Sequence, residues 1–286
     1  MPALTLYTCL IEEQNSLSPF VQVYWAYATH IGEAIELMVQ AARANGLSNP
    51  EPREIDPFAL ERLRGEVIPA SSAPVFWAPT CHHFPPERVF QLPYGIIASC
   101  REGEHDSSDI TAGYSRGKNA EGMTTIEVNV ERNDLLSLYE RLLQVQDSYK
   151  VFWYLLHDHW EEQVDQFLVN ERLTSAATIS AHLRRHSLDA VQNGYVTLTA
   201  YGTEGATNLN ISDHKRVVVL TYADELAEAY CATLQAAGYL EVNELVSIDQ
   251  GIHHWHYRHP NSRSRAALMA YLRTIEFTDW HPPQPS

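Results

Sequence analysis

Histidines are the residues of this chain whose types and spacing could do chemistry. There are 14 of them in 286 residues, and several are grouped. Residues two apart in a strand point to the same face, so a His-x-His pair at a strand end can offer two imidazoles to one metal ion. Such pairs occur at His157 with His159 and at His254 with His256, and the next histidine after the second pair is His259. A third group is His82-His83.

A metal centre needs three or four ligands that converge from different elements, often with a carboxylate among them. The sequence does not show whether His157, His159, His254 and His256 converge. Strand-surface histidines beside aromatic residues are the simpler interpretation, and the sequence favours it. We therefore predict no metal site and no cofactor, with a histidine-centred, metal-dependent hydrolase as the alternative.

Other catalytic patterns are missing from the sequence. It has no G-x-S-x-G nucleophile motif, no phosphate-binding loop and no dinucleotide-binding glycine pattern. The four cysteines, Cys9, Cys81, Cys100 and Cys231, are not at metal-ligand spacing, so we expect free thiols. No pair of carboxylates is marked as a glycosidase pair. The sequence thus predicts a protein that is not an enzyme.

The elements that must position these residues follow from periodicity and turn signals. Strands are predicted over 4–11, 20–27, 75–78, 94–99, 124–130, 151–156, 195–201 and 216–222, and helices over 31–42, 135–145, 175–186, 224–237 and 262–275. The apolar run 151–156 is typical of a strand buried on both faces. The segment 202–215 is expected to connect two paired strands, and 241–248 with 252–258 to form a hairpin.

This order of elements predicts an α+β fold, with mixed, largely antiparallel sheets, packed helices and two halves that each contain a strand-helix-strand unit. The segment 101–122 is rich in Gly, Ser and Asp and lies between the halves. We expect an N-terminal α+β domain over 1–110 and a C-terminal α+β domain over 120–280. A flexible loop within one domain is the alternative interpretation of this segment.

The charge and composition of the chain limit the classes of partner that it can bind. The formal net charge is -16, which disfavours binding to nucleic acid and to anionic membranes and attracts basic proteins. Acidity that serves only solubility is the alternative. The N-terminal residues lack the basic segment of a signal peptide, and no run of about 18 apolar residues is present. We expect a cytoplasmic protein.

Three blocks of sequence resemble a known class of proteins. They are VQVYWAYATHIGEAIELM at 21–38, VFWYLLHDHW at 151–160 and NGYVTLTAYGTEGATNLNISDHK at 193–215. They are similar to immunity proteins of bacterial polymorphic toxin systems, in particular those that neutralise nuclease toxins of restriction-endonuclease fold delivered by type VI secretion. The resemblance implies a non-enzymatic protein that binds a cognate toxin.

The expected function is therefore neutralisation of a basic toxin, a nuclease in the first instance, by stoichiometric occlusion. A nuclease carries basic surface for phosphates, which an acidic inhibitor can imitate. A regulatory interaction module is a further alternative, and a homodimer is compatible with each. The residues expected to bind the partner are Glu161, Glu162, Asp165, Asn208, Asn210 and Asp213.

Overall fold

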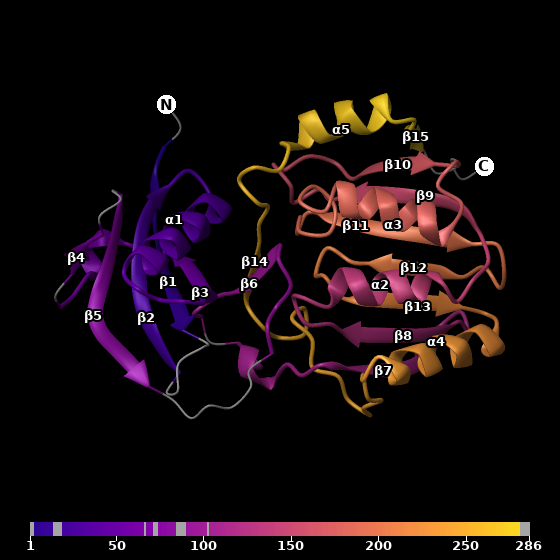
Figure 1. The fold of residues 1–286 in the computed structure, drawn as a ribbon, viewed down its shortest axis with the longest axis horizontal. Coiled ribbons are helices and arrows are strands. Elements are labelled where there is room, and N and C mark those ends of the chain that lie inside the picture. The colour runs from indigo at the N-terminus through magenta and orange to yellow at the C-terminus, as the bar shows by residue number, and fades with distance from the viewer. Residues whose placement is uncertain are drawn as a thin grey trace.

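Two β-sheets stand side by side, each covered by helices on one face (Figure 1). The α+β class predicted from the sequence is confirmed, because pairing within both sheets is largely antiparallel. Within the described ranges, no helix is both long and apolar enough to cross a lipid bilayer. The computed structural model describes residues 3–13, 19–65, 67–70, 74–83, 90–101 and 103–280.

The first sheet is built mainly from the N-terminal part of the chain, and its last strand comes from near the C-terminus. All its pairs are antiparallel except β3 with β6. In spatial order its strands are β14 (His254–His256), β6 (Ile96–Ala98), β3 (Pro50–Pro57), β1 (Thr5–Glu13), β2 (Phe20–Ala28), β5 (Val75–His83) and β4 (Ile68–Pro69).

The second sheet is antiparallel throughout. Because its neighbouring strands pair in register, residues on successive strands form rows that face one side of the sheet. In spatial order its strands are β15 (Thr278–Trp280), β10 (Gln166–Asn170), β9 (Tyr149–Leu156), β11 (Val196–Gly202), β12 (Asn208–Ile211), β13 (Val217–Thr221), β8 (Thr124–Asn129) and β7 (Gly113–Lys118).

The helices cover one face of each sheet and bury its apolar side chains. α1 packs on the first sheet, and α2, α3 and α4 lie in front of the second sheet in Figure 1. The helices are α1 (Ile31–Ala44), α2 (Leu135–Leu143), α3 (Ala176–Arg185), α4 (Asp224–Ala236) and α5 (Arg265–Thr274), with short 3-10 turns η1 (Leu60–Arg62) and η2 (Ser107–Asp109).

The second sheet has an open face, which corrects one expectation. The run 151–156 is not buried on both sides. Phe152, Tyr154 and Leu156 are fully buried against the helices, whereas Trp153 and Leu155 are only partly buried. The helices cover a single face, so the apolar side chains that point away from them remain half-exposed.

The segment 202–215 is also more than a turn. β12 lies inside it and separates β11 from β13, so the direct pairing expected for 195–201 with 216–222 is wrong. Leu209 and Ile211 are fully buried on the helix side, while Asn208 and Asn210 point to the open face. The polar residues of this strand made the segment resemble a turn, although its apolar residues belong to the core.

The hairpin expected from 241–248 and 252–258 is wrong as well. β14 pairs with β6 of the first sheet, about 158 positions earlier in the chain. A turn does form, with Gln250 N–H donating to the Ser247 carbonyl. Beyond it the chain crosses to the first sheet, because Trp255 packs on that core and its Nε1 donates to Asp56.

Three smaller differences concern predicted loops. β5 continues to His83, beyond the strand predicted over 75–78, and residues 84–89 and 281–286 lie outside the described residues. The predicted linker at 101–122 contains β7. β10 and β15 were not predicted, and they extend the second sheet at one edge.

Contacts between the two sheets centre on β6 and β14, which lie between them in Figure 1. Gly95 and Gly194 approach so closely that a Cβ at Gly194 would lie 2.0 Å from the Gly95 carbonyl oxygen. This close approach allows Gly194 N–H to donate to the Tyr257 carbonyl and Tyr257 N–H to donate to the Gly95 carbonyl. The crossing strand is therefore tied to both parts of the molecule.

Candidate metal centre

Six metal-ligating side chains meet where β14 faces the second sheet. Two come from the loop after β9, two from the β12–β13 turn and two from β14. They form the histidine cluster, which consists of His157, His159, Asp213, His214, His254 and His256.

Three imidazoles of the cluster form one potential ligand set. His214, His254 and His256 each offer a ring nitrogen, and these atoms lie within 4.8 Å of one another. The ring centroid of His214 is 5.0 Å from that of His254 and 4.8 Å from that of His256. Ligands thus converge from a turn of the second sheet and a strand of the first, as a metal centre requires.

Hydrogen bonds fix the tautomer of all three rings. His254 Nδ1 is 2.9 Å from the Ile252 carbonyl oxygen, His256 Nδ1 is 2.5 Å from the Gly194 carbonyl oxygen, and His214 Nδ1 is 3.1 Å from Asp213 Oδ1. Carbonyl and carboxylate oxygens only accept, so each Nδ1 carries the proton. Each Nε2 is left with a free lone pair, which is the arrangement of metal-ligating histidines and their supporting acceptors.

The turn between β12 and β13 presents Asp213 and His214. Ser212 N–H donates to the Arg216 carbonyl, and Lys215 adopts a positive φ of 59° that closes the turn. Asp213 N–H donates to Thr197 Oγ1 of β11 at 2.9 Å. The buried Lys215 Nζ donates to the Val196 carbonyl at 2.9 Å. The turn is therefore attached to the neighbouring strand at two points.

The loop after β9 presents His157 and His159, whose ring centroids are 5.3 Å apart. β9 ends at Leu156, so these rings share a side without belonging to a strand. Arg265, a buried residue at the start of α5, donates to the carbonyls of His157 and Val164. The final helix thus positions the loop, a role of this arginine that no local sequence pattern indicates.

Burial makes the imidazoles of His157, His254 and His256 poor bases, which suits a metal ligand that must be neutral. Burial lowers the pKa of His256 to about 3 and also lowers the pKa of His157 and of His254. Burial alone would raise the pKa of Asp213, but the hydrogen bond from His214 and the nearby histidines hold that pKa well below its ordinary value. The cluster therefore combines the Asp213 carboxylate with three rings, those of His157, His254 and His256, whose pKa is lowered.

The donor set indicates the class of ion. Three imidazoles suit Zn²⁺ and related transition-metal ions, whereas Mg²⁺ and Ca²⁺ prefer oxygen ligands. Three protein ligands leave a fourth position of a tetrahedral ion for water or substrate. The His214 side chain is 24% exposed, so solvent reaches this ligand set.

The sequence had singled out four of these histidines without showing that they converge, and the structure brings all four together. It also adds His214, which no sequence pattern had indicated as a ligand, although it directly follows Asp213 in the segment 202–215. The other histidine pair, His82 and His83, is exposed at the end of β5 and is not part of the cluster.

The residues expected to bind a partner are divided among three places. Glu161 and Glu162 are exposed, with positive φ of 62° and 51°, in the loop that carries His159. Asp165 is exposed in the same loop and accepts from the Asp158 N–H. The remaining three are Asn208 and Asn210, on the open face, and Asp213, inside the histidine cluster.

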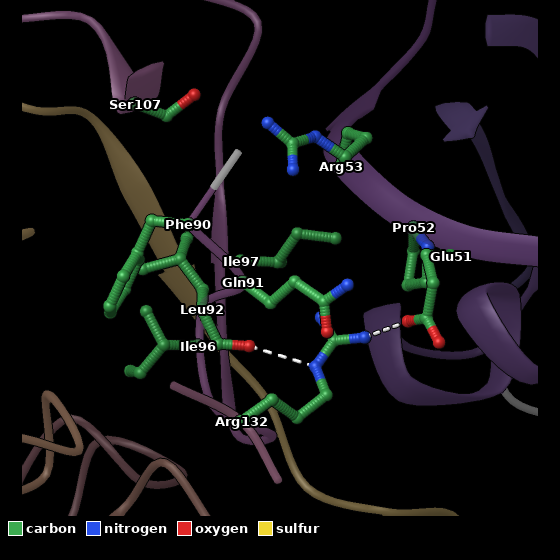
Figure 2. A pocket seen from close by; sticks show the side chains of 10 residues that line it. All are labelled: Glu51, Pro52, Arg53, Phe90, Gln91, Leu92, Ile96, Ile97, Ser107 and Arg132. Carbon is green, nitrogen blue, oxygen red and sulfur yellow. Dashed lines mark hydrogen bonds and ion pairs between the residues drawn. The ribbon is translucent and has the colours of Figure 1, made fainter. Parts of the chain in front are cut away.

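A separate small cavity lies between the sheets (Figure 2). Arg132, which follows β8, pairs with Glu51 of β3, and its Nε donates to the Leu92 carbonyl at 2.9 Å. Arg53 pairs with Glu12 at 3.4 Å. Both arginines are thus paired with a glutamate. We therefore interpret the cavity as a gap in the packing between the two sheets.

The histidine cluster thus rests on the geometry of this chain alone. Comparison with protein-family models, with curated proteins and with solved structures gives no match.

Proposed function

We propose that this protein binds a transition-metal ion, Zn²⁺ or a close analogue, through His214, His254 and His256, and that it is a metal-dependent hydrolase. This is the alternative that the sequence left open. The observation that carries it is the convergence of three imidazoles whose Nδ1 atoms are all held by acceptors.

The chemistry follows from the open coordination position. Zn²⁺ held by three protein ligands lowers the pKa of a bound water to about 7, which supplies a nucleophile for hydrolysis at neutral pH. Asp213 supports the centre by accepting from His214, as carboxylates do for zinc-bound histidines. The net charge of -16 also raises the local concentration of divalent cations.

The test measures metal binding and hydrolysis on the same protein. The chain is stripped with a chelator, reloaded with Zn²⁺, desalted and analysed for metal per protein. We expect at least one equivalent in the wild type and loss of the tightly bound ion in His254→Gln. Hydrolysis of p-nitrophenyl acetate should follow the metal content.

The matched control is His82→Gln, which changes an exposed histidine outside the cluster. It should leave metal content and hydrolysis unchanged. Wild-type protein that retains no zinc after reloading would overturn the metal centre. Zinc binding without any hydrolysis would overturn the hydrolase and leave a structural metal site.

Neutralisation of a basic nuclease toxin in the cytoplasm is the second candidate function. The open face of the second sheet favours it. Asn210 and Trp153 lie on either side of the buried Thr199 in one row across β12, β11 and β9, and both are partly exposed on the side away from the helices. Tryptophan among polar side chains is typical of the centre of a protein interface.

Growth rescue tests this candidate. Cells that express a nuclease toxin encoded beside the gene for this chain should survive when the chain is co-expressed. Trp153→Ala with Asn210→Ala should abolish rescue if the open face binds the toxin, whereas His254→Gln should not. Rescue that depends on His254 and not on Trp153 would contradict this interface.

A further inference from the structure

A second ligand set adjoins the first within the histidine cluster. His157, His159 and Asp213 each offer one ligand atom, and these atoms lie within 4.8 Å of one another. His157 Nε2 is 3.9 Å from Asp213 Oδ1, and His159 Nε2 is 4.0 Å from Asp213 Oδ2. Both oxygens of one carboxylate therefore face imidazole nitrogens of the loop after β9.

The two sets are in direct contact. The ring centroids of His159 and His256 are 4.5 Å apart, and Asp213 Oδ1 also accepts from His214 Nδ1. Asp213 thus lies between the sets, and its charge reduces the repulsion that two cations at this distance would feel. Pairs of ions in neighbouring sites are a recurrent arrangement in hydrolytic enzymes.

We propose that His157, His159 and Asp213 bind a second divalent transition-metal ion beside the first, which makes the histidine cluster a two-ion centre. The proposal rests on the proposed function only in that the first ion occupies the neighbouring set. The ligand is again an ion that prefers imidazole with one carboxylate, such as Zn²⁺ or Co²⁺.

The second set binds its ion less tightly than the first, for two reasons. His157 Nε2 now forms a 2.8 Å hydrogen bond with Thr197 Oγ1, which an ion at that nitrogen must replace. The His159 side chain is also 37% exposed, so this set is the one nearer to solvent. The first set, by contrast, has all three Nδ1 atoms already held by acceptors.

The experiment counts ions in the full-length protein. Chelator-stripped protein is titrated with Co²⁺ and followed by visible absorption, and metal per protein is then measured after zinc loading at saturating and at low free Zn²⁺. We expect two equivalents at saturation and one at low free Zn²⁺. His159→Gln should reduce the saturated value from two to one and keep the tighter ion.

Two further variants separate the possible failures. His254→Gln should remove the tighter ion, and His157→Asn should repeat the effect of His159→Gln, with circular dichroism confirming that each is folded. One equivalent in the wild type that His159→Gln leaves intact overturns the second set and retains the first. If the wild type binds one equivalent of metal and both His159→Gln and His254→Gln lose it, the two-ion centre is overturned. A single ion with ligands from both sets would then be the explanation. No bound metal overturns both proposals.

Discussion

Asp213 contacts three imidazoles of the histidine cluster, His157, His159 and His214. The sequence had assigned it to a protein interface, where its charge would attract a basic partner. Only 14% of its side chain is exposed, and its charge is directed at the histidines. A charge reversal at Asp213 would therefore disturb the cluster itself and would not report on an interface.

Replacing Asp213 by asparagine should weaken zinc binding about 10- to 100-fold, as loss of a supporting carboxylate usually does. The amide keeps the size of the side chain and removes its charge. Competition with a chromophoric chelator measures the affinity. Asp147→Asn, at an exposed site outside the cluster, is the control and should bind zinc as the wild type does. Equal affinities for the two variants would argue against a supporting role of Asp213.

His182 gives a prediction that is independent of metal. Its Nε2 is 2.8 Å from the Tyr154 hydroxyl, and from α3 its ring packs against Phe152 and Phe277. Burial lowers the pKa of His182 to about 4, followed in importance by the charges of His186 and Arg185. In the unfolded chain histidine titrates near pH 6.5, so protons bind the unfolded state more strongly between these values.

The contribution of His182 to stability is therefore complete above about pH 6.5 and decreases as the pH falls toward 4, by at most about 3 kcal/mol. Urea unfolding of wild type and His182→Gln from pH 7.5 to 4 measures this. Glutamine keeps an acceptor for Tyr154 and does not titrate, so the free energy of unfolding of the variant should fall less. Parallel curves for the two proteins would show that His182 does not carry the dependence.

At the scale of elements, α5 has an unexpected part in the site. The Arg265 guanidinium reaches the carbonyls of His157 and Val164 at both ends of the loop that carries His159. Arg265 is 4% exposed, and its removal would leave the two carbonyls without their charged donor. The helix thereby couples the C-terminal part of the chain to the cluster.

Arg265→Met should lower the free energy of unfolding by about 2 kcal/mol, because two carbonyl groups lose their charged donor. Hydrogen exchange should accelerate over 157–165, and zinc affinity should fall. Arg273→Met removes an arginine from the other end of α5, where it pairs with Asp279 at the surface. That control should cost less than about 1 kcal/mol. A similar loss of unfolding free energy in both variants would mean that Arg265 contributes only its positive charge and not its hydrogen bonds to the loop.

The local sequence pattern was sufficient to predict most helices and strands of the fold. The i, i+3, i+4 spacing in α1 and the alternation in β1, β2, β8 and β11 each identified an element close to its true bounds. Ser175 caps α3 through a hydrogen bond from Thr178 N–H, at the residue where the predicted helix begins. Asp134 precedes α2 but makes no capping bond with its side chain, which a sequence pattern does not reveal.

Long-range pairing was not accessible to the same reasoning. Period two correctly placed His254 and His256 on one side of a strand, but not the partner of that strand, which is β6. Convergence of the histidines depends on this pairing and on β12, which delivers Asp213 and His214 to the same end of the second sheet. Neither follows from local spacing. The sequence therefore indicated two separate histidine pairs and did not indicate that they form one cluster.

At the scale of the whole molecule, the first ligand set joins the two sheets. His254 and His256 belong to a strand of the first sheet, and His214 belongs to a turn of the second. An ion bound by all three would link the sheets directly. Metal binding should therefore stabilise the molecule as a unit.

Calorimetry can test this coupling. Free Zn²⁺ at 100 times the dissociation constant should add about 2.7 kcal/mol to the free energy of unfolding for one site. It should also raise the unfolding temperature, and the sheets should unfold in one transition. With excess chelator the shift should disappear, and His254→Gln should show none at the same zinc concentration. A wild type that is insensitive to zinc would exclude a link of this kind.

The pairing of β14 with β6 also has a consequence for synthesis of the chain. The first sheet keeps an unpaired edge at β6 until residues 254–256 leave the ribosome, by which time most of the second sheet has been made. Unpaired strand edges promote aggregation of nascent chains. A fragment that ends near residue 110 should expose this edge permanently, and chaperone demand should be greatest while the middle of the chain is being translated.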